Sequence, residues 1–168
     1  MRKYIYMSLF FFFLNCNPLY KQYQEMNKNA KGNLYNEQLR NIKSILSKEN
    51  RRAILIISWE KNILGKDGGL YYKALIYDPL SGEKKLFRTT ERNPETIIIP
   101  EDNSDVNFKE LIYILDNYIN GNEEYLLSLK DSFNSAEIGY PYYIYDFAKG
   151  KKIKIKSFVF DKNGKLIQ

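Results

Sequence analysis

The chain has 168 residues and a formal net charge of +6, with 26 Lys and Arg residues against 20 Asp and Glu. It contains no histidine and a single cysteine, Cys16. This inventory excludes Ser-His-Asp and Cys-His catalysis, zinc sites built on His or on several Cys ligands, and any disulfide within the chain. The modest positive charge does not by itself indicate a nucleic acid partner, and none is predicted.

The N-terminus has the order of an export signal. Arg2 and Lys3 precede an apolar run from Tyr4 to Leu14, and polar residues follow directly after Cys16. As a helix this run would extend about 16 Å at ~1.5 Å per residue, roughly half of the ~30 Å hydrocarbon core of a bilayer. Residues 1–15 are therefore predicted to be a removable signal peptide rather than a transmembrane helix.

The end of this signal, Phe13-Leu14-Asn15-Cys16, resembles a bacterial lipobox, in which the cysteine becomes the first mature residue and carries the lipid. Phe13 and Asn15 stand where the usual pattern has Leu and Gly or Ala, as in the relaxed lipoboxes of some bacterial groups. The resemblance implies that Cys16 is lipidated, with palmitate among its acyl groups, and anchors the protein to a membrane of the bacterial cell envelope. It leaves the leaflet open, and the alternative is an ordinary signal peptide with an incidental cysteine.

Behind the cysteine, residues 16–33 are rich in Asn, Lys and Gln and predict a polar tether, part of which would alternatively extend the next helix. Residues 34–168 are long enough for a single domain with a sizeable core. Within them, Leu39, Ile42, Ile45 and Leu46 are spaced as on one helix face and predict an amphipathic helix over 34–48. The apolar run AILIISW at 53–59 predicts a central strand buried on both faces.

The next elements are predicted to form an antiparallel meander. Two strand-like runs, LYYKALIYDP and EKKLFRTT, are joined through a turn signal that contains Pro79 and Gly82, and a short fourth strand follows at 95–100. GKDGG at 65–69 lacks phosphate-loop spacing and is interpreted as a loop. Connections this short favour antiparallel pairing, because parallel crossovers need a dozen or more residues.

Two helices are expected next, one from a capping-box start at Asn107 and Glu110 to a stop at Asn120-Gly121, and one over 123–133. The C-terminal part is strand-like, with turns at Gly150 and Asn163-Gly164. The fold class is therefore predicted to be α+β: an antiparallel meander sheet with an N-terminal helix packed on it, a two-helix insertion, and a C-terminal hairpin that rejoins the sheet. A single core is expected from Ile54, Leu55, Ile56, Ile57, Trp59, Leu75, Ile97, Ile98, Leu111, Leu115 and Phe158.

The strongest candidate binding feature is basic. Alternation in KGKKIKIKSFVF predicts that Lys152, Lys154 and Lys156 share one strand face with Phe158 and Phe160. These lysines would protect a sheet edge, or they would form an anion-binding strip for lipid headgroups, an anionic surface polymer or an acidic protein partner. Residues 101–137 carry a net charge of −7 and residues 149–168 a net charge of +6, so the strip would alternatively be neutralised within the molecule.

Two weaker features complete the candidates. Tyr140, Tyr142, Tyr143 and Tyr145 would stack on sugars, although tyrosine is also simply favoured in strands. The acidic stretch from Glu101 to Glu110 would hold Ca²⁺ or perform acid–base chemistry, but acidic residues are also typical of a helix N-terminus, which is the preferred interpretation. No metal site, cofactor or catalytic residue is predicted.

These features favour a membrane-tethered, non-enzymatic binding or interaction domain of unknown ligand. The alternatives are a carboxylate-based enzyme acting on glycans, which would need two acids roughly 5 to 9.5 Å apart in one cleft, and a structural envelope or toxin-neutralising protein.

Overall fold

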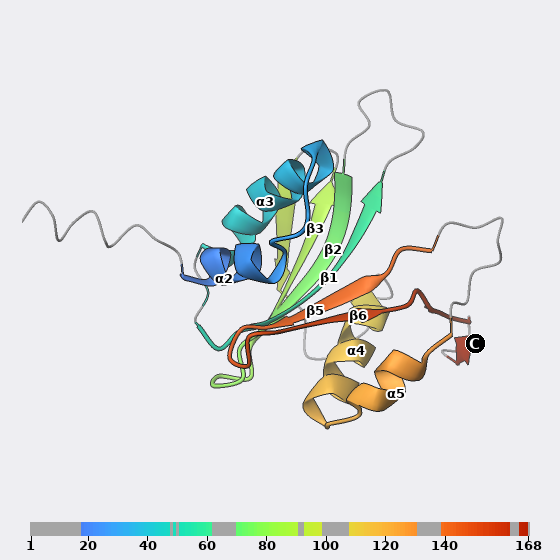
Figure 1. The fold of residues 1–168 in the computed structure, drawn as a ribbon. Coiled ribbons are helices and arrows are strands. Elements are labelled where there is room, and N and C mark those ends of the chain that lie inside the picture. Colours follow the sequence, from blue (N-terminus) through green and yellow to red (C-terminus); the bar gives the residue numbers. More distant parts are fainter. Residues whose placement is uncertain are drawn as a thin grey trace, which may run out of the picture.

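The computed structural model of the chain describes residues 18–47, 49, 51–61, 70–90, 93–98, 108–130, 139–161 and 165–167. Their main feature is a six-stranded sheet with a pair of helices on each face (Figure 1). The helices are α2 (Pro18–Met26), α3 (Asn33–Leu46), α4 (Lys109–Ile119) and α5 (Glu123–Ser128). The strands are β1 (Ile54–Lys61), β2 (Leu70–Tyr77), β3 (Lys84–Thr90), β4 (Asn93–Ile98), β5 (Tyr142–Asp146), β6 (Lys151–Ile155), β7 (Val159–Phe160) and β8 (Leu166–Ile167). The predicted α+β class is confirmed.

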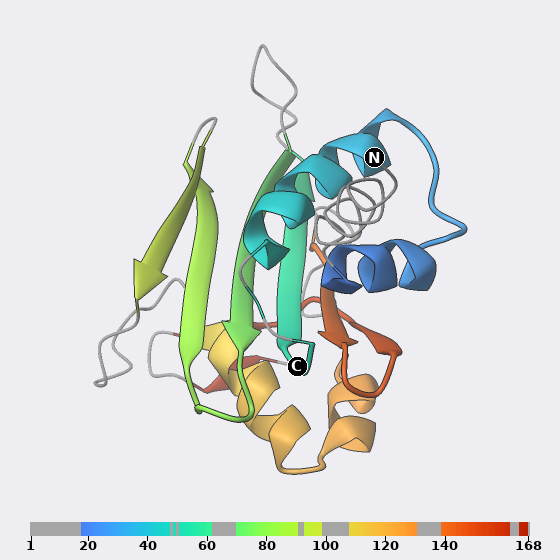
Figure 2. The same ribbon diagram turned by 90° about the vertical axis from the view of Figure 1, so that its left-hand side faces the viewer.

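The sheet has the order β4-β3-β2-β1-β5-β6, and all of its neighbouring strands are antiparallel (Figure 2). The predicted meander is therefore confirmed over β1 to β4. The β2–β3 turn has Gly82 at φ 74°, and Asp78 N donates to the Glu83 carbonyl at 2.9 Å. The positive φ explains why glycine suits this position. The two-helix insertion follows β4, and β5 then returns to pair with β1.

Strand β1 lies inside the sheet because its sequence is apolar on both faces. Residues 53–59 are all buried. Ile54 and Ile56 pack on the α4 and α5 side, whereas Leu55, Ile57 and Trp59 pack on the α2 and α3 side. The expected single core is thus two cores, one on each face, because both faces of the sheet are covered by helices. Every predicted core residue among those whose side chains are described is buried; Ile97 and Ile98 lie outside that set.

Helix α2 corrects the prediction of a polar tether over residues 16–33. Leu19 and Tyr23 lie one helical turn apart and are 0% and 1% exposed, so they anchor this helix in the core on the α3 side. Gln22 Nε2 also donates to the Phe147 carbonyl at 3.0 Å, next to the end of β5. A segment that looked polar by composition is therefore an integral part of the domain from residue 18 onward.

The predicted C-terminal hairpin that rejoins the sheet is confirmed by β5 and β6, whereas two details of the C-terminal part are corrected. The hairpin of β5 and β6, with Gly150 at φ 61° in its turn, joins the main sheet, whereas β7 and β8 form a separate two-stranded sheet. Phe158 does not share a face with the lysines: it is fully buried in the opposite core, against Tyr142 at a ring-centroid distance of 5.2 Å. The alternation stops because β6 ends at Ile155.

Other boundaries differ modestly. Helix α5 ends at Ser128, short of the predicted 133, and residues 131–138 lie outside the described residues. Helix α4 ends as predicted, with Gly121 at φ 80° directly after its C-cap Asn120. Asn107, the GKDGG loop and the Asn163-Gly164 turn lie outside the described residues.

Candidate functional site

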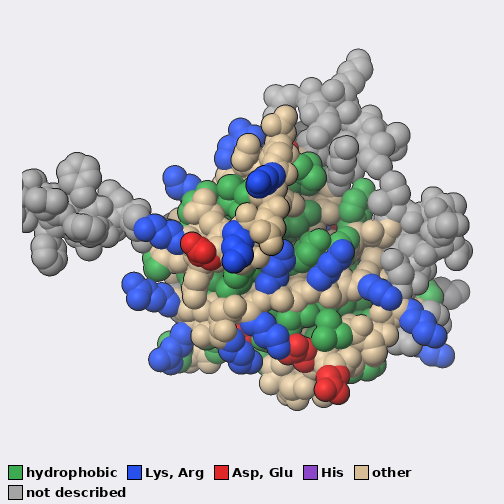
Figure 3. All heavy atoms as spheres, viewed as in Figure 1, with side chains coloured by type: hydrophobic (Ala, Val, Ile, Leu, Met, Phe, Trp, Pro, Cys, Tyr) green, Lys and Arg blue, Asp and Glu red, His purple; other side chains and the backbone are tan. Residues whose placement is uncertain are grey.

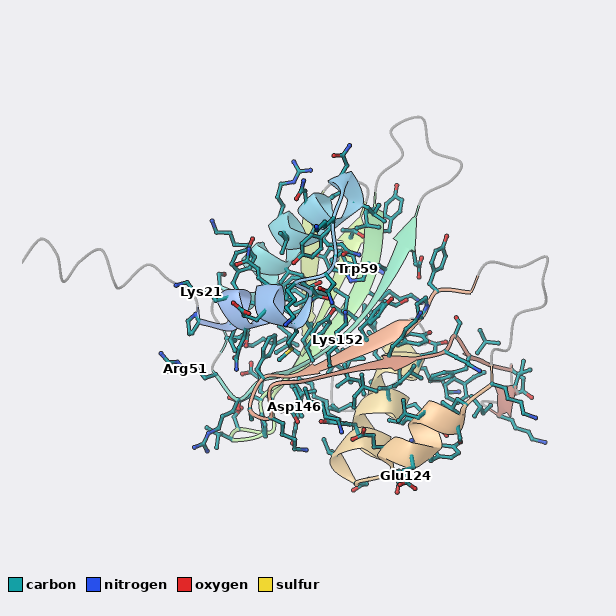
Figure 4. The ribbon with its side chains drawn as sticks, in the orientation of Figure 1. Lys21, Arg51, Trp59, Glu124, Asp146 and Lys152 are labelled. Carbon is teal, nitrogen blue, oxygen red and sulfur yellow. The ribbon has the colours of Figure 1, made fainter. Side chains whose placement is uncertain are left out.

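An open cleft lies on the face of the sheet that carries α2 and α3. Its volume is about 320 Å³. Figure 4 labels two of its residues, Trp59 from β1 and Lys152 from β6, on this side of the sheet. The cleft is lined by Asn27, Ala30, Leu34, Gln38, Trp59, Leu70, Tyr140, Pro141, Tyr143, Tyr145 and Lys152. It therefore combines aromatic walls with a few polar groups, the usual composition of a small-ligand site.

Strand alternation explains how β5 supplies two of the aromatic walls. Tyr143 and Tyr145 are two residues apart and line the cleft, whereas Tyr142 points to the opposite core. Tyr140, which precedes the strand, also lines the cleft. The structure therefore brings together three of the four tyrosines singled out in the sequence and separates the fourth.

Lys152 is the only charged side chain among the described residues that line the cleft. Its Nζ donates to Asn27 Oδ1 at 2.6 Å and lies 5.1 Å from the ring centroid of Tyr143 and 5.5 Å from that of Tyr145. Cation–π attraction at these distances favours the ammonium. Burial, with a further contribution from the nearby Lys154, lowers the pKa of Lys152 from its ordinary value.

Asn27 organises this corner of the cleft, and its side chain is buried. Its Nδ2 donates to the Tyr23 carbonyl at 2.8 Å, one turn earlier along the chain. Its Oδ1 accepts from Lys152 and also from the Tyr145 hydroxyl at 3.2 Å. Because the backbone contact fixes the amide orientation, the oxygen is held towards the lysine and the tyrosine.

Two of the cleft tyrosines, Tyr143 and Tyr145, stay neutral at ordinary pH. Burial raises the pKa of Tyr145 to about 12, and burial also raises the pKa of Tyr143. Neutral phenols both donate and accept hydrogen bonds. The cleft thus offers one cation, neutral amides and hydroxyls, and aromatic surface.

The three candidate lysines of the basic strip have different surroundings. Lys154 lies opposite Tyr143 in the β5–β6 register, next to the cleft, and its side chain is exposed. Lys156 follows the end of β6 and is also exposed. Neither Lys154 nor Lys156 makes a hydrogen bond or ion pair with a described residue. Only Lys152 is part of the cleft lining.

Two other lysines of the same hairpin neutralise nearby acids. Lys151 Nζ lies 2.6 Å from a carboxylate oxygen of Glu123, at the start of α5, and Lys149 Nζ lies 3.4 Å from the buried Asp146. Lys151 therefore neutralises part of the negative charge of the two-helix insertion, on the side of the sheet that carries α4 and α5. No described carboxylate lies within ion-pair distance of Lys152 or Lys154.

Positive charge also extends over the surface around the cleft. Figure 3 shows Lys and Arg side chains spread over the face formed by α2, β5 and β6, with few acidic side chains between them. Exposed basic residues include Lys21 on α2, Lys28 and Lys31 between α2 and α3, Arg51 between α3 and β1, Lys154 on β6 and Lys156 just after it. An approaching anion would therefore meet a favourable potential before it reached Lys152.

Several predicted features fall outside this site. Cys16 lies outside the described residues, as does most of the acidic stretch from Glu101 to Glu110. Within the described part of the chain, no group of acidic or cysteine side chains is arranged to hold a metal ion. No helix among those residues has the length and apolarity required to span a bilayer.

Sequence reasoning missed Asn27, Gln38 and Trp59 as cleft residues. Asn27 was hidden because its segment was interpreted as a tether, although the spacing of Leu19, Tyr23 and Met26 carries a weak helical signal. Trp59 was expected only as a core residue, and it is indeed 7% exposed while one side of it borders the cleft.

The fold and site together define a small α+β domain with an open, aromatic, lysine-bearing cleft. Comparisons with protein-family models, with curated proteins and with solved structures find no match to this chain.

Proposed function

We propose that the protein is an exported lipoprotein of the bacterial cell envelope, anchored through Cys16, whose domain binds a ligand in the cleft between α2, α3 and strands β1, β5 and β6. The observation that carries the binding role is Lys152, a lysine in an aromatic cleft whose polar partner is an amide and not a carboxylate. A lysine kept for internal stability would be expected to pair with an acid, as Lys151 does with Glu123.

The side chains that line the cleft favour ligand binding over catalysis. The described lining contains no carboxylate, whereas glycan cleavage by acid–base catalysis uses a pair of them. It also contains no hydroxyl or amine paired with a base as an activated nucleophile would be. Aromatic walls and neutral hydrogen-bonding groups instead suit reversible recognition.

The anchor and the packed domain would lie close together. Helix α2 begins at Pro18, two residues after Cys16, and two residues span at most ~7 Å of extended chain. A lipid on Cys16 would therefore hold the packed domain at the membrane surface rather than at the end of a long tether. The ligand would be a molecule present in the layer directly next to that membrane.

A photocrosslinking experiment tests the binding role in the native envelope. In the test variant, p-benzoylphenylalanine replaces Leu34, which lines the cleft and is 45% exposed. In the control variant it replaces Leu127, which lies on α5 on the other side of the sheet and is 51% exposed. We expect a discrete adduct from position 34 that position 127 does not give. Absence of an adduct at position 34, or identical adducts at both positions, would contradict the proposal. A stoichiometric adduct with one exported protein would instead favour the toxin-neutralising alternative.

A further inference from the structure

The charge balance of the cleft indicates the kind of ligand it takes. The lining holds a single ammonium, and no described acid neutralises it. One cation balances a ligand group with one negative charge, such as a carboxylate, better than a phosphate monoester that carries about −1.5 to −2 at neutral pH. Phosphate sites also commonly use Arg forks or clustered backbone N–H groups, and the described lining has no Arg.

The shape and walls of the cleft point to a ring-sized ligand. Its volume of about 320 Å³ is at the lower end of the ~300 to 1,000 Å³ typical of small-molecule sites. Tyr140, Pro141 and Tyr143 are partly exposed and offer flat apolar surface, while Asn27 and Gln38 place amides in the lining. A sugar presents both an apolar face of C–H groups and a rim of hydroxyls, so it matches walls of both kinds.

We propose that the cleft binds a sugar carrying a carboxylate, with the Lys152 ammonium pairing with the carboxylate, Tyr140 and Tyr143 contacting the ring face, and Lys154 attracting the next acidic unit of a polymer. This assignment rests on the proposed binding function and names its ligand class. It also explains why Lys154 lies across from Tyr143 with no acidic partner among the described residues. The lowered pKa of Lys152 is the expected property of an ammonium that lacks a counter-ion in the unliganded state.

Isothermal titration calorimetry on the full chain in detergent tests the ligand class. The probes are D-glucuronate, D-glucose, acetate, inorganic phosphate and a short Asp-rich peptide. Glucuronate is expected to bind on the order of ten-fold tighter than glucose, because a hydrogen bond to a charged group contributes more than a neutral one. It is also expected to bind more tightly than acetate, because the ring contacts the aromatic walls.

Lysine variants that lose the same charge at different positions test whether the preference for glucuronate depends on the cleft. Lys152→Gln should remove the preference for glucuronate over glucose. Lys156→Gln makes the same charge change just after the end of β6 and outside the cleft, so it should bind glucuronate within about two-fold of the native chain. Because Lys152 also contacts Asn27, Lys154→Gln serves as a second variant, at a lysine that makes no hydrogen bond or ion pair with the described part of the chain. It should weaken binding of a glucuronate-containing oligosaccharide by about five-fold at low salt.

The contrary outcomes separate the two proposals. Equal affinity for glucuronate and glucose, or for glucuronate and acetate, would overturn the acidic sugar, as would tighter binding of phosphate or of the acidic peptide. Equal losses of glucuronate affinity in Lys152→Gln and Lys156→Gln would show that the ligand binds to a diffuse basic strip and not in the cleft. If no probe binds but the adduct at position 34 forms, the ligand class fails and the binding function stands. If neither occurs, both fail.

Discussion

The ammonium of Lys152 donates a hydrogen bond of 2.6 Å to Oδ1 of Asn27, a residue 125 positions away in the chain. This contact joins the edge strand β6 to the residue that directly follows the C-terminal end of helix α2. It places a positive charge in the lining of an aromatic cleft, and the amide accepts this hydrogen bond without neutralising the charge. The proposed recognition site and the packing of α2 against the sheet therefore share this pair of residues.

The first prediction concerns this pair. Asn27→Ala removes the acceptor of both the Lys152 ammonium and the buried Tyr145 hydroxyl. We expect the free energy of unfolding to fall by about 1 to 3 kcal/mol, because a buried hydroxyl and an ammonium each lose an acceptor. Urea unfolding followed by circular dichroism measures this. Asn36→Ala, at an exposed position on α3, is the control and should change stability by less than about 0.5 kcal/mol. A loss at Asn27 no larger than in the control would mean that the contact is not maintained.

The second prediction tests the two-faced core. Ile56 is 0% exposed in the central strand, so Ile56→Ala should cost about 2 to 5 kcal/mol through lost burial and a cavity. Leu80→Ala, at a β2–β3 turn position that is 69% exposed, provides the comparison and should be nearly neutral. A loss below about 0.5 kcal/mol at Ile56 would remove this residue from the core.

Parts of this fold can be predicted from the sequence because their signals are local. The apolar run at 53–59 indicates a strand buried on both faces, and Gly82 and Gly121 occupy positions of positive φ at chain reversals. Helix α2 was missed for a physical reason: a nine-residue helix is marginal alone and gains its stability from packing. Its two buried anchors, Leu19 and Tyr23, are too few to give a strong periodic pattern.

The cleft was harder to predict than the fold. Alternation groups Tyr143 with Tyr145 correctly, but it does not tell which face of the sheet is left partly open, because helices cover both faces. Alternation also does not show where a strand ends. It places Phe158 on the lysine face, but β6 ends at Ile155 and the Phe158 ring packs in the opposite core. Asn27 and Lys152 meet only through the tertiary fold.

The third prediction concerns alkaline pH. Burial raises the pKa of Tyr72 and Tyr145 to about 12 and raises that of Tyr23, Tyr118 and Tyr142 as well. Above pH 10 the unfolded chain loses these protons while the folded chain keeps them, so the unfolded state binds fewer protons and stability falls as pH rises. Stability should therefore be fully retained below about pH 10 and decrease between about pH 10 and 12.

Urea unfolding at pH 8, 10 and 11, with tyrosinate absorbance near 295 nm, measures this pH dependence. Part of the tyrosinate signal should appear only together with loss of the folded circular dichroism spectrum. The matched variant Tyr145→Phe should make the pH dependence shallower. Complete tyrosine titration of a chain that stays folded would contradict the assigned burial.

The fourth prediction addresses the anchor. Cys16→Ala should release the protein from the washed membrane fraction, because the cysteine is the only residue that the lipobox resemblance would acylate. Asn17→Ala, which keeps the cysteine, should remain with the membranes. Metabolic labelling with an alkyne fatty acid gives an independent readout. If Cys16→Ala still partitions with the membranes as the native chain does, Cys16 is not the anchor.

The most direct test of the cleft uses the protein's own reporter. Trp59 is the single tryptophan of the chain and lines the cleft, so ligand entry should alter its emission. Fluorescence titration of the full chain with a glucuronate-containing oligosaccharide is expected to give a saturable change in intensity or wavelength. The same titration should give a much weaker response in Lys152→Gln and a native one in Lys156→Gln. Emission that does not saturate, or that changes equally in both variants, would contradict the conclusion that the cleft around Lys152 is the binding site.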